Sequence, residues 1–134
     1  GLNSGFMITQ YSAASMVSEN KVLAHPASVD SIPSSANQED HVSMGTTAAR
    51  KARLILDNVE KVLAIEAFAA SQAISFREGA VLGKGTRRAY EEIRKHVPPV
   101  ENDRIMYVDM DKLDKMVKSG AFVKAVEETL GELE

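Results

Sequence analysis

The sequence contains no cysteine among its 134 residues. Thiol catalysis, disulfide bonds and zinc sites built from thiolates are therefore excluded. Long apolar runs are missing too, since none approaches the roughly 20 residues that a membrane-spanning helix needs. No basic segment followed by an apolar one marks a secretory signal peptide. We therefore expect no membrane insertion and a cytoplasmic location.

The sequence also lacks an excess of positive charge. Its 16 Lys and Arg against 19 Asp and Glu give a net charge of −3. A nucleic-acid-binding domain normally carries a strongly basic face, so we expect no nucleic-acid partner. Only 5% of the residues are aromatic, but 44% are hydrophobic. A chain of this length and composition can bury a hydrophobic core, which excludes disorder of the whole chain.

The hydrophobic periodicity predicts an all-α protein, and no strand pattern or internal repeat is visible. The segment from Phe6 to Ala24 predicts a helix that is apolar or small on nearly every side, as is typical of a buried helix. His25-Pro26 ends it, because the residue before proline is disfavoured in the α region. The chain opens at Gly1 without an initiator Met and enters this helix at once. We interpret this as the interior of a longer protein.

Residues 43–77 predict one long helix of a bundle. At a rise of 1.5 Å per residue it would be roughly 50 Å long, so we expect it to pack against partners outside this chain. Its apolar residues alternate by four and three positions, the spacing of a bundle seam. This stripe consists of Ala48, Ala52, Ile55, Val59, Val62, Ala69, Ala73 and Phe76. Glu66 falls on the same stripe and is either a buried carboxylate with a partner or, more simply, a residue at its edge.

Residues 78–134 predict short helices after a glycine-rich connector. The expected helices run from about Thr86 to His96, with Thr86 as N-cap, from Asp109 to Lys118 and from Ser119 to Leu130. Gly83-Lys84-Gly85-Thr86 follows a helix and lacks the spacing of a phosphate-binding loop, which favours a plain connector.

A long loop is expected over residues 26–41, which are dense in Ser, Asn, Asp and Pro. Long loops in compact domains are uncommon and often functional. This loop ends in Asn37-Gln38-Glu39-Asp40-His41. Either Asp40 or Ser43 caps the following helix, or the segment is the edge of an active site. No helical spacing of metal ligands joins these residues to His25, so we expect no metal site.

Several ordered strings closely resemble histidine ammonia-lyase, a family of the aromatic amino-acid lyase superfamily. The resemblance runs nearly without a gap from residue 1 to about residue 49, and more weakly to the tail around Val117-Lys118-Ser119-Gly120. The matching strings are Gly1-Leu2-Asn3-Ser4-Gly5-Phe6-Met7-Ile8, Ser18-Glu19-Asn20-Lys21, Ala24-His25-Pro26-Ala27-Ser28-Val29-Asp30-Ser31 and, most specifically, Ser35-Ala36-Asn37-Gln38-Glu39-Asp40-His41-Val42-Ser43-Met44.

The resemblance implies the C-terminal part of the ammonia-lyase fold, an all-α homotetramer built on a long-helix bundle. It also implies elimination of ammonia from L-histidine to give trans-urocanate. The family's electrophile, 4-methylideneimidazole-5-one (MIO), forms autocatalytically from an internal Ala-Ser-Gly, and this tripeptide is absent here. The family's catalytic tyrosines and its carboxylate-binding arginine also lie outside the matching part. The chain alone is therefore expected to be inactive and to associate with itself.

Glu39 matches the family's active-site glutamate. The resemblance implies that it is catalytic and substrate-binding, either by hydrogen-bonding the imidazole or by shuttling a proton. Phenylalanine and tyrosine lyases tend to carry an amide at this position, so Glu39 favours histidine. Gln38 is expected beside the substrate. Met7 lies on the helix that lines the family's substrate pocket, although simple core packing explains it equally well, and Tyr11 is not assigned as the catalytic tyrosine.

The predicted organisation is one C-terminal helical piece of a larger lyase over residues 1–134. It comprises an active-site helix and loop (1–42), a long bundle helix (43–77) and C-terminal short helices (78–134). Two alternatives remain open: a fragment of an aromatic amino-acid ammonia-lyase or aminomutase, and a non-catalytic helical interaction module.

Overall fold

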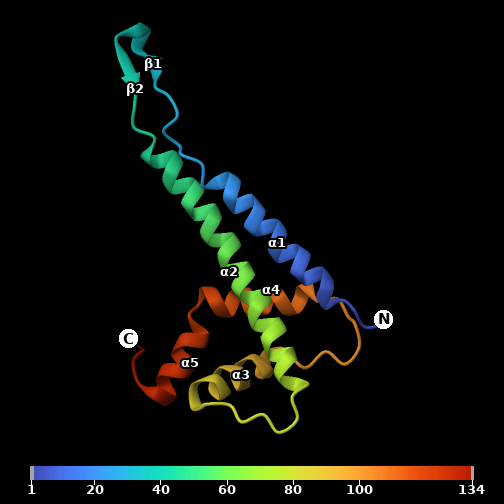
Figure 1. Ribbon diagram of the computed structural model, residues 1–134. Helices are drawn as coiled ribbons and strands as arrows, with labels where there is room; N and C mark the ends of the chain where they lie inside the picture. Colours follow the sequence, from blue (N-terminus) through green and yellow to red (C-terminus); the bar gives the residue numbers. More distant parts are fainter. Residues whose placement is uncertain (1, 134) are drawn as a thin grey trace. The chain divides into compact units, whose positions relative to one another are not determined.

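The computed structural model describes residues 2–133, which are mostly helical, as predicted (Figure 1). Its elements are α1 (Phe6–Leu23), β1 (Ile32–Ser34), η1 (Ser35–Asn37), β2 (Glu39–His41), α2 (Gly45–Ser75), α3 (Lys84–His96), α4 (Tyr107–Lys118) and α5 (Ala121–Leu130). None of the helices in this described part is long and apolar enough to cross a membrane. The chain divides into two compact units: a smaller one, Ala14–Val59, and a larger one made of Gly1–Ala13 and Glu60–Glu134.

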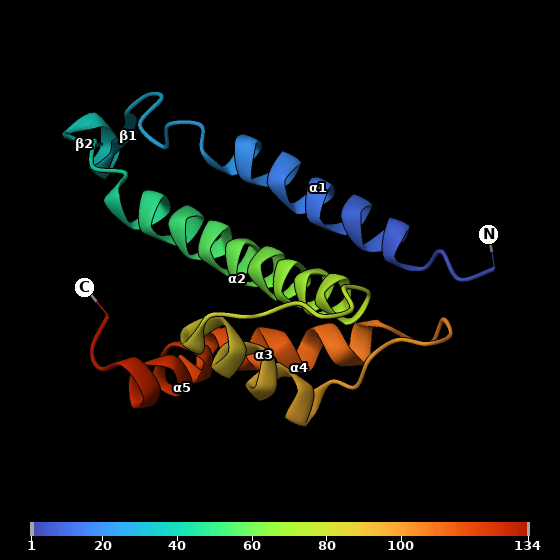
Figure 2. The same cartoon turned by 60° about the horizontal axis from the view of Figure 1, so that its bottom comes forward.

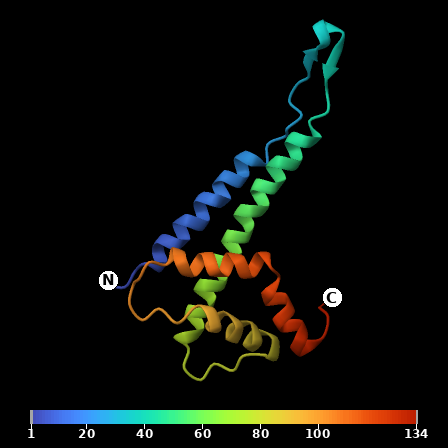
Figure 3. The ribbon, with the colours of Figure 1, turned by 180° about the vertical axis from the view of Figure 1, so that it is seen from behind.

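The core of the larger unit lies where the second half of α2 meets α3 and α4 (Figure 2). Phe68 of α2 and Leu113 of α4 are fully buried there, both with 0% of their surface exposed. The ring of Phe68 packs against that of Phe6, with 4.7 Å between centroids. Helix α5 turns back from α4 and packs against α3 (Figure 3). The buried members of this core are Ala64, Phe68, Ile93, Val97, Val100, Met106, Leu113 and Met116.

The buried face of α2 in the larger unit is displaced by one residue from the predicted stripe. Ile65, Phe68 and Gln72 are buried, whereas Ala73 is exposed and Phe76 is 76% exposed. One residue corresponds to a rotation of about 100° around a helix. The predicted stripe therefore leaves most of its surface uncovered within this chain. That it packs against partners outside this chain stays a prediction.

Hydrogen-bonded polar side chains account for this displacement. Ser71 and Gln72 are buried, at 1% and 6% exposure. The hydroxyl of Ser71 donates to the Phe68 carbonyl at 2.9 Å, so its burial leaves no unpaired donor. Glu66 is exposed, as are most residues of the predicted stripe in this chain, so both interpretations of Glu66 stay predictions.

A side-chain clamp fixes the segment that joins α3 to α4. The Gln72 amide donates from Nε2 to the Val100 carbonyl at 2.9 Å, and its Oε1 accepts from the Val100 N–H at 2.9 Å. Arg104 donates to the carbonyls of the two prolines before Val100, at 2.8 and 3.0 Å, and from Nε to Asp109 Oδ2 at 2.8 Å. Asp109 is only 5% exposed, and the guanidinium balances its buried charge.

Helix α3 begins one turn earlier than predicted, because Gly83 rather than Thr86 is the N-cap. The close approach of α5 depends on Gly85. A Cβ at this position would lie 2.8 Å from Leu130 Cδ1 and 3.3 Å from Val126 Cγ1. The glycine-rich segment is thus part connector and part helix.

In the smaller unit, the end of α1 is joined to the first half of α2 by hydrogen bonds. Asn58 is 8% exposed, and its Nδ2 donates to Glu19 Oε2 at 2.8 Å and to Asn20 Oδ1 at 2.9 Å. The Lys51 ammonium donates to the carbonyl of His25, just beyond the end of α1. These contacts position the segment that leads into the hairpin.

Two short antiparallel strands, β1 and β2, stand where a loop without strands was expected (Figure 1). The paired residues are Ile32 with His41, Pro33 with Asp40, and Ser34 with Glu39. Each strand has only three residues, and β1 contains a proline. Neither strand therefore shows the period-2 alternation by which a strand is recognised. The expectation of no strand is corrected accordingly.

Helix α1 is largely uncovered within this chain. Of its residues, only Thr9 is buried. Ile8, Val17 and Val22 are 67%, 45% and 67% exposed, whereas Phe6 packs against Phe68. That the helix is buried among other helices of a larger assembly stays a prediction.

Candidate functional site

The β1–β2 hairpin holds Glu39 at the start of its second strand. Glu39 pairs with Ser34, whose hydroxyl donates to the Glu39 carbonyl at 3.4 Å. The Ser35 hydroxyl donates to the carboxylate itself, at 3.2 Å from Oε2. No hydrogen bond within the described residues engages the second carboxylate oxygen, Oε1. The carboxylate therefore has one oxygen held and the other available for a donor.

The turn between the strands is left-handed. Ser35, Ala36 and Asn37 have φ values of +49°, +53° and +66°. The left-handed conformation costs roughly 1–2 kcal/mol for an ordinary L-residue, and asparagine tolerates it best of these three. The Gln38 N–H closes the turn by donating to the Ser35 carbonyl at 3.1 Å. Backbone strain of this kind is often found at functional sites.

Every residue from 28 to 43 is exposed in this chain. The Glu39 carboxylate therefore stands in water, where it can accept a hydrogen bond from an N–H group or lie beside a cation. Charge interactions are weak in water and strengthen when water is excluded. The hairpin supplies a directed acceptor, and further protein surface is needed to make an enclosed site.

The structure brings together two of the three predicted site residues. Gln38 and Glu39 are neighbours in the hairpin, whereas Met7 belongs to α1 in the larger unit. Met7 is 63% exposed in this chain, and both interpretations of it, pocket lining and core packing, stay predictions. Tyr11, one turn further along, is 70% exposed.

The structure rejects Asp40 as a helix cap. Asp40 lies in β2 opposite Pro33. The first backbone bond of α2 runs instead from the Ala48 N–H to the Met44 carbonyl, at 2.9 Å. His25 lies beyond the end of α1 with its Nδ1 3.0 Å from the Val22 carbonyl. Within residues 2–133, no group of three or more His, Asp or Glu could hold a metal ion.

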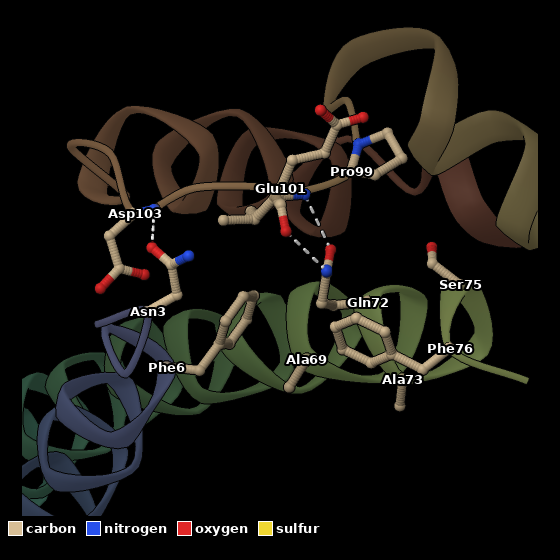
Figure 4. Close-up of a pocket in the computed structure, with 11 residues that line it drawn as sticks. Asn3, Phe6, Ala69, Gln72, Ala73, Ser75, Phe76, Pro99, Glu101 and Asp103 are labelled. Atoms are coloured by element: carbon tan, nitrogen blue, oxygen red, sulfur yellow. Dashed lines mark hydrogen bonds between the residues drawn. The ribbon is translucent and has the colours of Figure 1, made fainter. Parts of the chain in front are cut away.

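The sequence did not indicate a groove of about 770 Å³ in the larger unit (Figure 4). Phe6, Phe76 and the clamp residue Gln72 line it, together with Asn3 and Asp103 near the start of α1. Two of its polar side chains are already engaged: Gln72 holds Val100, and Asp103 Oδ2 accepts from the Gly5 N–H at 2.9 Å. Its lining residues lie up to about 100 positions apart in the chain, so no local motif reveals the groove.

Two groups on α3 have lowered pKa values, because neighbouring hydrogen-bond donors favour their ionised forms. Hydrogen bonds from Lys95 and then Arg88 lower the pKa of Glu92 to about 2. The pKa of Tyr90 is lowered, chiefly by the hydroxyl of Ser75, with Arg94 contributing. The Glu92 shift comes from ion pairs along α3, and the Tyr90 shift comes mainly from a hydrogen bond to the last residue of α2. Ion pairs and hydrogen bonds of this structural kind also shift pKa values away from functional sites.

Ser35 is the site residue that sequence analysis did not single out. It is part of the string that carries the resemblance, but a hydroxyl that folds back onto a carboxylate four positions later has no sequence signature outside a helix. The left-handed φ of Ser35 brings the two groups together, and that dihedral angle cannot be inferred from the residue type.

Comparison with known proteins gives consistent matches along the whole chain. Residues 1–95 match the family described as aromatic amino acid lyase. Histidine ammonia-lyase of Alkaliphilus metalliredigens is 65% identical over 130 residues, which cover 97% of this chain and 26% of that protein. The corresponding enzyme of Symbiobacterium thermophilum is 60% identical over 134 residues, covering 100% of this chain and 26% of that protein. The chain thus spans about a quarter of the length of the curated relatives that it matches.

Solved structures agree with the sequence matches. Histidine ammonia-lyase from Trypanosoma cruzi superposes with a TM-score of 0.89 at 46% identity, covering 96% of this chain and 25% of that one. Tyrosine aminomutase from Streptomyces globisporus gives a TM-score of 0.87 at 40% identity, covering 96% of this chain and 24% of that one. The five helices and the hairpin are therefore a portion of the fold that these enzymes share.

Proposed function

The chain belongs to the aromatic amino acid lyase family, and on that premise we propose that it is part of an enzyme that eliminates ammonia from L-histidine to give trans-urocanate. The observation that carries the proposal is Glu39. In a chain that is about 60% identical to histidine ammonia-lyases over nearly all its length, this carboxylate lies on an exposed hairpin with one oxygen available.

Glu39 suits an imidazole substrate. A carboxylate accepts a hydrogen bond from an imidazole N–H and favours a positive charge on the ring. When other parts of the enzyme exclude water from the site, the same carboxylate can also hold or deliver a proton at the ring nitrogen. On this proposal, the neighbouring residue Gln38 contacts the substrate and Met7 lines the apolar side of the pocket.

The remaining chemistry comes from outside this chain. The family's MIO group supplies an electrophile when it is present in the enzyme. The 134 residues contain no Ala-Ser-Gly from which it could form, and they therefore do not fit the role of its source. On this proposal the chain alone is inactive and works within the homotetramer of the full enzyme.

A hybrid enzyme tests the proposal. This chain replaces the matching quarter of the Alkaliphilus metalliredigens histidine ammonia-lyase, and urocanate formation is followed by absorbance. We expect an active hybrid, no activity from the 134-residue chain alone, and a loss of about 100-fold or more in kcat/KM for Glu39→Gln. Glu78→Gln, at an exposed position after α2, is the matched control and should retain full activity.

Two results would contradict the proposal. Unchanged turnover of the Glu39→Gln hybrid would remove Glu39 from the site. A folded, tetrameric hybrid that accepts tyrosine or phenylalanine but not histidine would favour the alternative of an aromatic amino-acid lyase or aminomutase. The likeness to tyrosine aminomutase makes that substrate comparison necessary.

A further inference from the structure

We infer that Ser35 is a positioning residue, which holds the Glu39 carboxylate in the orientation that receives the substrate. The inference rests on the proposed function, because Ser35 has this role only if Glu39 faces the substrate. Its basis is the hydrogen bond from Ser35 Oγ to Glu39 Oε2, at 3.2 Å.

Within this chain, the Ser35 hydroxyl is the group that restrains the Glu39 side chain. No side chain from 28 to 43 is buried among the described residues, so packing within this chain does not fix the rotamer of Glu39. A free glutamate side chain loses considerable rotamer entropy when it is ordered, and an unrestrained one must lose it during substrate binding. A hydroxyl donor to one carboxylate oxygen orders the side chain beforehand and leaves Oε1 for the substrate N–H.

The backbone places the hydroxyl where it is needed. Ser34 and Glu39 are directly paired across the two strands, so the next residue, Ser35, lies beside the Glu39 side chain. Its φ of +49° turns the hydroxyl back toward the carboxylate. Glycine would adopt this φ at lower cost, but it has no hydroxyl to donate. Backbone conformation and hydrogen bonding thus make different demands at this position.

The experiment separates the effect of the hydroxyl from that of the backbone by comparing two Ser35 variants in the active hybrid enzyme. Ser35→Ala removes the hydroxyl and keeps the Cβ, whereas Ser35→Gly removes the hydroxyl and eases the left-handed backbone. We expect both variants to lower kcat/KM by about 10-fold to 100-fold, the range for loss of a hydrogen bond to a charged group. Ser31→Ala is the control, because Ser31 is exposed just before β1, and it should leave activity unchanged.

The decisive measurement is the double variant. In the Glu39→Gln background, Ser35→Ala should change kcat/KM by less than about twofold, because the carboxylate that Ser35 orients is gone. A purely structural role of Ser35 would instead cost the same factor in both backgrounds. It would also allow Ser35→Gly to restore the activity that Ser35→Ala loses.

Failure of this inference is distinguishable from failure of the proposed function. An enzyme that is sensitive to Glu39→Gln but unaffected by both Ser35 variants overturns the positioning role alone. Equal losses in the two backgrounds, or full activity of Ser35→Gly, overturn it as well. An enzyme insensitive to Glu39→Gln contradicts the proposed function itself, and the role of Ser35 falls with it.

Discussion

Replacing Gln72 by methionine should destabilise the larger unit by removing the clamp on Val100. Gln72 is 6% exposed and Val100 9% exposed, so water cannot readily replace the lost partner. Both backbone groups of Val100 would lose their hydrogen bonds, each of 2.9 Å. An unsatisfied buried backbone group costs about 1–3 kcal/mol, and methionine offsets part of this by burying apolar surface. We expect the free energy of unfolding to fall by about 2–4 kcal/mol.

Urea denaturation and amide hydrogen exchange measure the two parts of this expectation. Gln72→Met should lower the urea midpoint, while Gln10→Met, at an exposed position of α1, should not. The Val100 amide should lose its protection from exchange. The Val97 amide, which donates to the Ile93 carbonyl at 2.9 Å, should lose less. An unchanged midpoint together with a protected Val100 amide would refute the reasoning.

Three further predictions concern association, acid and backbone conformation. Light scattering at micromolar concentration should report dimers, tetramers or larger species of this chain. The reason is that apolar side chains such as Ile8 and Phe76 are exposed and lack partners among the described residues. A stable 14.6 kDa monomer would contradict this prediction. Hydrogen bonds from Lys95 and Arg88 lower the pKa of Glu92 from its ordinary value of 4.5 to about 2, so Glu92 should contribute stability above about pH 4.5 that is lost as the pH falls toward 2. Acid titration followed by circular dichroism should show less of this loss in Glu92→Gln. Gly120 has a φ of +70° and open space around it, so Gly120→Ala should lower the free energy of unfolding by about 1–2 kcal/mol through the backbone alone; an unchanged Tm would contradict this.

The conformation of the β1–β2 hairpin could not be predicted from the sequence. The string around Glu39 indicated the family and a function that can be tested, but it did not indicate the hairpin conformation. Strands of three residues have too few positions to show a period, and Pro33 argues against a strand on general grounds. The turn is made by Ser35, Ala36 and Asn37 without glycine, which is the residue that usually marks a left-handed turn.

The long helix α2 shows a different limit. Its existence and its ends were predictable to within about two residues, because a pattern of more than 30 residues is strongly periodic. Its buried face was not, because Asn58, Ser71 and Gln72 are polar and buried. Their burial depends on hydrogen bonds to groups as far away as Val100, and hydropathy assigns such residues to solvent.

The tie between Gly5 and Asp103 has a consequence for the order of events during synthesis. The Gly5 N–H donates to an aspartate 98 positions later, and the Asn3 side chain accepts from the N–H of the same aspartate. A ribosome adds about 5–20 residues per second, so the beginning of α1 waits roughly 5–20 s before its tether exists. Throughout that interval Phe6 has no completed core to enter and remains available to other nascent chains. The larger unit can therefore close only late in translation, and of the five helices α1 to α5, α1 is the one that a chaperone would have the longest time to bind.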